Sequence, residues 1–162
     1  MTNTGNGNDP STSPDWSAAQ DKASRYFTVR EALFLPSWGR LAVEQDFPGQ
    51  PDWSVVTANL QQFMPKMDAV REWFGAPIRV HVTLRPPAYN LAIGGAFGSA
   101  HISGLACDFD VQGIECGNAI ESILQNGMLD AWGLRMEDNG PLPSWIHLDA
   151  RAPGPGGRYF KP

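Results

Sequence analysis

Four short segments of the sequence read as β-strands, and they constrain the fold more than any other feature. They are PIRVHVTLR (77–85), GLACDFDV (104–111), WGLRME (132–137) and SWIHLDA (144–150). The first alternates apolar and polar residues strictly, which is typical of a strand with one buried face. Helical patterns lie at 51–75 and at 117–127. This order predicts an α+β fold, with helices packed on one face of a small, largely antiparallel sheet.

Length and composition predict one domain with a short tail at each end. The chain has 162 residues, enough for one sizeable core. Residues 1–22 are rich in Asn, Gly, Ser, Thr, Pro and Asp, so we expect a flexible tail before a domain at 23–152. Residues 153–162 are expected to form a C-terminal tail, or a strap that closes over the domain. We expect a monomer.

Charge and hydropathy exclude several classes of partner. The formal net charge of -5 provides no basic field for nucleic acid. No run approaches the roughly 20 apolar residues of a membrane span, so we expect no membrane insertion. The first residues also lack a signal-peptide pattern, which predicts a protein that stays in the cytoplasm of the cell that makes it. The two cysteines, Cys107 and Cys116, are expected to be buried thiols.

Local signals mark helix ends and one long loop. Thr28 is expected to cap a short helix with Glu31 as its capping-box partner. The helical pattern at 51–75 predicts one kinked helix or two, because Pro65 lies inside it and is expected to break the helix near Met64 or to open a second one. Residues 86–98 are rich in proline and glycine and are expected to form an irregular surface loop.

The polar positions of the predicted strands bring chemically capable side chains to one face. The chain has three histidines, at 81, 101 and 147. Alternation puts His147 and Asp149 on the face opposite Ile146 and Leu148, and Asp108 and Asp110 on one face of their own strand. His101 lies just before that strand, where a loop can fold back over it. Two histidines and one carboxylate form a three-ligand set for catalytic zinc, with a fourth position left for a water molecule whose pKa the metal lowers toward about 7. The alternative is a surface histidine beside solvated aspartates, and spacing alone does not exclude it.

Two longer segments resemble a known family. VTLRPPAYNLAIGGAFGSAHISGLACDFDV (82–111) and PSWIHLDAR (143–151) strongly resemble the zinc D-Ala-D-Ala carboxypeptidase-like peptidoglycan peptidases, which share a fold with the hedgehog signalling domain. The resemblance covers residues 26–151. Its motifs are the Arg-Pro turn with Tyr-Asn, the Ser-x-His-x-x-Gly-x-Ala-x-Asp run and the aromatic residue before x-His-x-Asp. They correspond here to Arg85, Tyr89 and Asn90, to Ser99, His101, Gly104, Ala106 and Asp108, and to Trp145, His147 and Asp149.

The resemblance implies roles for these residues. His101, Asp108 and His147 would bind one zinc ion on the open face of the sheet. Arg85 would orient the substrate, with Tyr89 as a further substrate contact. Ser99 would either bond the substrate or simply start the turn. Asp149 and Asp110 would steady the ligands from behind. His81 is expected to be structural.

The general base departs from the simplest family pattern. Many relatives carry Glu or Asp three residues before the last histidine ligand, whereas this chain has Ser144, as some relatives also do. Serine cannot serve as that base. The nearest carboxylates are Glu137 and Asp138, and either is a candidate.

The resemblance implies zinc-dependent hydrolysis of a peptide bond in the bacterial wall stem peptide. D-Ala-D-Ala carboxypeptidase and L-Ala-D-Glu endopeptidase activities both remain open. A phage lysis enzyme that reaches peptidoglycan after release from the host cytoplasm fits the absence of a signal peptide, and a virion-associated component is an alternative. The competing hypotheses are a catalytically silent zinc-containing binding module and a structural domain of a phage tail whose motif is vestigial.

Overall fold

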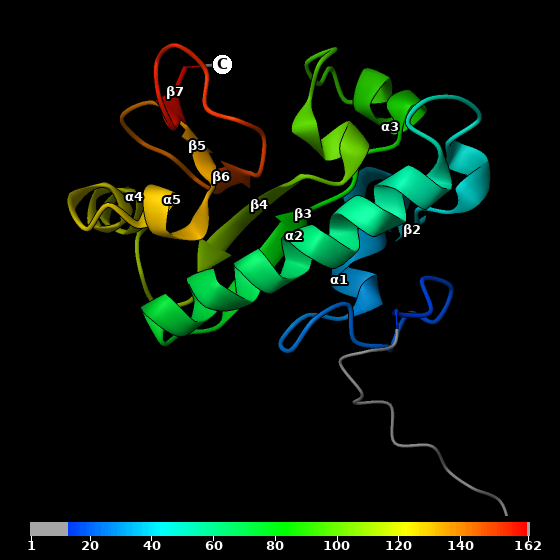
Figure 1. The fold of residues 1–162 in the computed structure, drawn as a ribbon, viewed down its shortest axis with the longest axis horizontal. Helices are drawn as coiled ribbons and strands as arrows, with labels where there is room; N and C mark the ends of the chain where they lie inside the picture. The colour runs from blue at the N-terminus through cyan, green and yellow to red at the C-terminus, as the bar shows by residue number, and fades with distance from the viewer. Residues whose placement is uncertain (1–12, 162) are drawn as a thin grey trace, which may run out of the picture.

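The sheet that organises the molecule has five strands. The computed structural model describes residues 13–161, so residues 1–12 of the expected N-terminal tail and Pro162 lie outside it (Figure 1). The strands lie in the order β3-β4-β6-β5-β7, and all neighbours are antiparallel except β5 and β7. Their bounds are β3 Ile78–Val82, β4 Ala106–Val111, β5 Arg135–Glu137, β6 Ile146–Asp149 and β7 Tyr159–Phe160. The mixed architecture and the largely antiparallel sheet confirm the expected α+β fold.

The remaining elements are helices and one small hairpin. The α-helices are α1 Val29–Leu33, α2 Trp53–Phe74, α3 Pro87–Ala92, α4 Cys116–Gln125 and α5 Met128–Trp132. Within residues 13–161, 3-10 turns occur at η1 Pro36–Trp38, η2 Glu44–Asp46 and η3 Ala100–Ser103. The strands β1 Phe34–Leu35 and β2 Arg40–Leu41 pair separately from the main sheet. The expected strand at 132–137 is therefore shorter than predicted, because Trp132 ends α5, and the expected loop at 86–98 contains α3.

The helix α2 is continuous through Pro65, so of the two predicted alternatives the one with two separate helices is wrong. Its first turn is capped by Asp52, whose carboxylate accepts a hydrogen bond from the Val55 amide at 3.0 Å, and Gly75 ends it in the left-handed conformation. Pro65 is exposed and removes one backbone hydrogen bond. The helix buries six apolar side chains in the core, and this packing outweighs the missing bond: Val56, Leu60, Phe63, Met64, Met67 and Val70. The predicted capping box of α1 is confirmed, because Thr28 and Glu31 bond each other's backbone amides.

Alternation separates the two faces of the sheet. Cys107, Phe109, Ile146 and Leu148 belong to the core that α2 covers, as Figure 1 shows where this helix crosses β3 and β4. The polar residues of β4 and β6 project from the other face. Both cysteines are free thiols and buried, as expected. None of the helices within residues 13–161 is long and apolar enough to cross a membrane.

Both terminal segments contact the rest of the domain, as only the strap alternative for the C-terminal segment allowed. The Val29 amide donates to the Asp21 carbonyl at 2.8 Å, and Trp16 packs against the core. At the other end β7 pairs with β5 beyond the expected domain boundary at 152. Residues 13–22 and 153–161 are thus attached to the domain, since a few apolar and backbone contacts suffice to order short polar segments.

Candidate metal centre

Three side chains from three elements meet on the polar face of the sheet. His101 comes from η3, Asp108 from β4 and His147 from β6, where His147 lies directly opposite Asp108 in the strand register. Asp108 Oδ1 lies 3.1 Å from His101 Nε2 and 2.7 Å from His147 Nδ1, and the two nitrogens are 3.2 Å apart. All three residues are buried. Within residues 13–161 this is the one group of His, Cys, Asp and Glu side chains with the spacing of a metal site.

The turn that carries His101 is built for this position. Ser99 caps η3 by accepting a hydrogen bond from the His101 amide at 3.4 Å. Gly104 ends the turn with φ of 70°, and a Cβ there would lie 3.0 Å from the Val56 carbonyl of α2. Only glycine combines that backbone conformation with such a close approach. The His101 amide carbonyl also accepts from the Arg85 amide at 3.0 Å, which joins η3 to the end of β3.

Hydrogen bonds orient both imidazoles toward a common point. His101 Nδ1 lies 2.8 Å from the Thr83 carbonyl, which can only accept, so Nδ1 carries the proton and Nε2 presents its lone pair. His147 turns Nε2 toward Asp149 Oδ2 at 3.5 Å and Nδ1 toward the cluster. Carbonyl and carboxylate partners behind ligand histidines are typical of metal sites.

Asp149 joins His147 to two arginines. The carboxylate is fully buried and accepts from Arg135 Nε at 3.0 Å and Nη2 at 2.9 Å. Arg151 Nη2 donates to the same carboxylate at 3.0 Å, while its Nη1 donates to the Gly98 carbonyl at 2.8 Å. Arg151 therefore connects β6 to the segment that leads into η3.

Arg85 pairs with the carboxylate of the cluster. Its Nη2 donates to Asp108 Oδ2, whereas Asp108 Oδ1 contacts the two histidines. Arg85 Nε is buried and has no hydrogen-bond partner among the described residues. The guanidinium thus keeps a free donor beside the cluster.

The surroundings set distinct protonation states. Burial lowers the pKa of His101, which favours the neutral imidazole that a metal requires. Burial also opposes the charged forms of the other two groups, but their mutual hydrogen bonds outweigh it. The pKa of Asp108 is therefore held well below its usual range, and that of His147 is raised to about 9. The site thus contains an ionised carboxylate at neutral pH.

The donor set fits a zinc ion. Zinc takes imidazole nitrogen and carboxylate oxygen at about 2.0–2.1 Å, and tetrahedral ligand atoms at that distance lie roughly 3.3 Å apart. The three atoms here are 2.7–3.2 Å apart, so small outward shifts suffice. Three protein ligands leave one position for a water molecule or a substrate, as in catalytic sites.

Other expected site residues lie at different distances from the cluster. Asp110 is on the same face of β4 but bonds His81 Nε2 at 2.8 Å and Arg79 Nε at 3.0 Å, so it does not contact a proposed ligand. The substrate contact expected for Tyr89 is wrong, because this residue is 2 % exposed and its hydroxyl accepts a hydrogen bond from the Ser37 amide at 3.2 Å. It supports α3 from the core side and cannot contact a substrate. Ser99 acts as the cap of η3.

The two candidate bases differ in their contacts. Glu137 is half-buried at the end of β5. Burial lowers the pKa of His147, the bonds to Asp108 and Asp149 raise it, and the charge of Glu137 raises it further. Asp138 Oδ1 accepts from the Gly140 amide at 3.0 Å. Ser144 is exposed.

Arg135, Arg151 and the Thr83 carbonyl were missed by the sequence reasoning. Arg135 could have been found, because it lies two residues before Glu137 on the polar face of a predicted strand. The other two depend on how η3 and its preceding segment fold back, which no local pattern predicts.

Comparison with known proteins gives one match. The family model described as Peptidase M15 matches residues 43–149, about two thirds of the chain. The matched region includes all three members of the cluster. No curated protein and no solved structure shows a significant match to the chain.

Proposed function

Because the chain belongs to the peptidase M15 family, we propose that it hydrolyses a peptide bond in the stem peptide of bacterial peptidoglycan, using a zinc ion held by His101, Asp108 and His147. The family match confirms the resemblance drawn from the motifs, and it supports a metallopeptidase that acts on peptidoglycan in general. The observation that carries the proposal is the convergence of three buried donor atoms on one point.

The roles of the protein's own side chains follow from their contacts. When bound, zinc would activate a water molecule and polarise the carbonyl of the scissile bond. Arg85, fixed beside Asp108 with part of its side chain exposed, would direct its positive charge at the negative charge that develops on that carbonyl oxygen. Asp149 holds the ring of His147 through Nε2, so that Nδ1 stays directed at the metal.

Glu137 is our candidate for the general base. It follows Arg135 by two residues on β5, and Arg135 bonds Asp149 on the polar face of the sheet, so alternation directs Glu137 to that face as well. Burial lowers the pKa of His147, and the bonds to Asp108 and Asp149 raise it. The charge of Glu137 also raises this pKa, which supports the nearness of Glu137 to the cluster. Asp138 instead bonds the following turn. A carboxylate near the metal can take a proton from the attacking water.

The bond that is cut belongs to one of two types. Release of a terminal D-alanine would make the protein a carboxypeptidase, and cleavage between L-alanine and D-glutamate would make it an endopeptidase. A role in phage-mediated lysis stays a prediction, as does the monomeric state.

The test is mass spectrometry of soluble fragments released from purified peptidoglycan by the zinc-loaded protein. We expect free D-alanine or a freed stem peptide, and neither from the chelated protein or from His101→Ala. Arg25→Gln is the matched control, because Arg25 pairs with Glu72 on α2, away from the cluster. This variant should release fragments at the wild-type rate.

Negative results separate the alternatives. If the wild-type protein binds one zinc ion per chain but releases no fragment, hydrolysis is wrong and a zinc-containing binding module takes its place. If it binds no stoichiometric zinc, the motif is vestigial and a structural role remains.

A further inference from the structure

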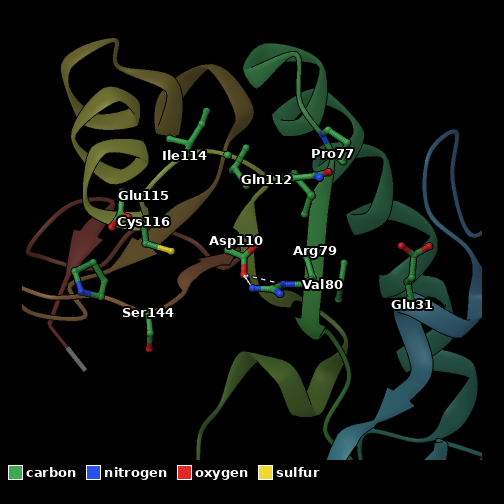
Figure 2. Close-up of a pocket in the computed structure, with 14 residues that line it drawn as sticks. Glu31, Pro77, Arg79, Val80, Asp110, Gln112, Ile114, Glu115, Cys116 and Ser144 are labelled. Carbon is green, nitrogen blue, oxygen red and sulfur yellow. Dashed lines mark hydrogen bonds and ion pairs between the residues drawn. The ribbon is translucent and has the colours of Figure 1, made fainter.

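A groove lies over the start of β3 and the end of β4, next to the metal cluster along β4 but not lined by any of its three residues. It is lined by the first residues of β3, by the end of β4 with the turn that follows, and by Pro143 and Ser144 before β6 (Figure 2). Its volume is about 1120 Å³, comparable with the roughly 300–1,000 Å³ of ligand clefts. Asp108 of the cluster and Asp110 of the groove are two residues apart on β4, a separation of about 7 Å. A peptide cut at the cluster can therefore continue into this groove.

Arg79 lines the groove, and one edge of its guanidinium is free. Figure 2 shows its guanidinium bonded to Asp110, where Nε and Nη2 both donate to Oδ2. His81 Nε2 lies 2.8 Å from the same oxygen, which fixes the carboxylate from the other side. The Arg79 side chain is 76 % exposed, and Nη1 has no hydrogen bond within residues 13–161. The end-on edge of the guanidinium, formed by Nη1 and Nη2, thus remains available for a second carboxylate.

The other charged side chains of the groove restrict where an anion can bind. Arg79 is the one cationic side chain among those that line it, beside Glu31, Asp110 and Glu115. Glu31 is bonded within the capping box of α1, and Asp110 is already paired. Glu115 is exposed on the α4 side and repels anions there. A carboxylate can therefore bind at the Arg79 end and not at the α4 end.

We propose that Arg79 is a specificity-determining residue that binds a free carboxylate of the substrate peptide, one or two residues from the bond cut at the cluster. The inference rests on the proposed function and names its substrate class, an acidic peptide. In the stem peptide, the α-carboxyl group of D-glutamate is such a group, and its carboxamide form would be the poorer substrate.

The experiment compares two synthetic stem peptides that differ only in that group, one a carboxylate and the other a carboxamide. For the wild-type protein we expect kcat/KM to favour the carboxylate by about tenfold, mostly through KM, as for one charge-assisted contact at a partly exposed site. Arg79→Gln should abolish the preference and leave zinc content unchanged. Arg79→Lys should retain part of it, and Arg25→Gln, which breaks an exposed pair on α2, should retain it fully.

A binding measurement keeps this inference separate from the proposed function. Equal kcat/KM for the two peptides, or a preference that survives in Arg79→Gln, would overturn the role of Arg79. If the wild-type protein cleaves neither peptide, the proposed function fails, and calorimetric binding of both peptides to His101→Ala decides the role of Arg79. Tighter binding of the carboxylate, lost on adding Arg79→Gln, supports it, and equal binding overturns it.

Discussion

At the residue scale, Glu137 and Asp138 are adjacent in sequence but differ in surroundings. We expect Glu137→Gln to lower kcat by at least about a hundredfold, because a positioned general base contributes 10²- to 10⁴-fold. Asp138→Asn should change kcat by less than about threefold, since its carboxylate bonds the turn at Gly140. Steady-state kinetics with bound zinc measured in parallel would check this. A larger loss for Asp138→Asn at full zinc content would reverse the assignment.

Asp149 provides a second residue-scale prediction, which concerns stability. Burial alone would raise its pKa, but hydrogen bonds from His147, Arg135 and Arg151 hold the pKa well below its usual range. The stabilisation is therefore present above about pH 4, the unfolded value, and is lost as the pH falls further. In the chelated protein, Asp149→Asn should reduce the free energy of unfolding by about 3 kcal/mol at pH 7, because two partly buried arginines lose their partner. Urea unfolding from pH 7 to pH 3 should show the difference shrinking below pH 4, and a constant difference would contradict this account.

The residues most accessible to sequence reasoning were those whose roles follow from alternation. His147 and Asp108 face each other across β6 and β4, as two strands with polar residues at those positions require. Tyr89 was misplaced because an aromatic residue after a Pro-Pro turn has the same local pattern whether it faces a substrate or the core. Its contact with Ser37 joins segments 52 residues apart, and no local signal encodes that.

At the scale of elements, Arg151 and Arg135 form a matched pair. Both bond Asp149, but Arg151 alone also holds the Gly98 carbonyl before η3. We expect either change to glutamine to weaken zinc binding by about tenfold, the lower end of the effect of outer-shell partners. Only Arg151→Gln should also increase hydrogen exchange of the amides at 94–99. The idea fails if the two variants show the same exchange in that segment.

The helix α2 carries a proline that the sequence suggested would break it. Pro65→Ala restores one backbone hydrogen bond on the exposed side of the helix, so we expect the free energy of unfolding to rise by about 1 kcal/mol or more. Chemical denaturation gives this value, and Lys66→Ala is the neighbouring comparison, expected to destabilise because it removes a bond to the Trp132 carbonyl. Unchanged or lower stability in Pro65→Ala would mean that α2 is built around the proline.

The helix also shows why the ends of an element were easier to predict than its continuity. The helical pattern at 51–75 agrees closely with the observed Trp53–Phe74, whose ends are fixed by the local geometry of the caps Asp52 and Gly75. Continuity through Pro65 depends on the apolar side that packs on the sheet, which is a tertiary effect. The same holds for α3, where short-range signals of proline and glycine favoured a loop.

At the scale of the whole molecule, the cluster joins parts of the fold that are far apart in the chain. η3, β4 and β6 contribute one donor each, and β5 and the segment before η3 support them through Asp149. The α+β class followed from strand and helix patterns, but the strand order did not, because β7 arises from a segment that resembles a tail. A metal bound at this junction would stabilise the native state as a whole.

This coupling gives the last prediction, that zinc raises the unfolding temperature of the entire protein. A ligand that binds only the folded state at about 1,000 times its Kd adds about 4 kcal/mol. For a chain of this size each kcal/mol corresponds to roughly 2–4 °C, so we expect a shift of about 8–16 °C that a chelator reverses. Differential scanning calorimetry would measure it, with His101→Ala as the variant that should not respond. If zinc does not change the Tm of the wild-type protein or of the control variant Arg25→Gln, the three donors do not bind the metal in the folded state.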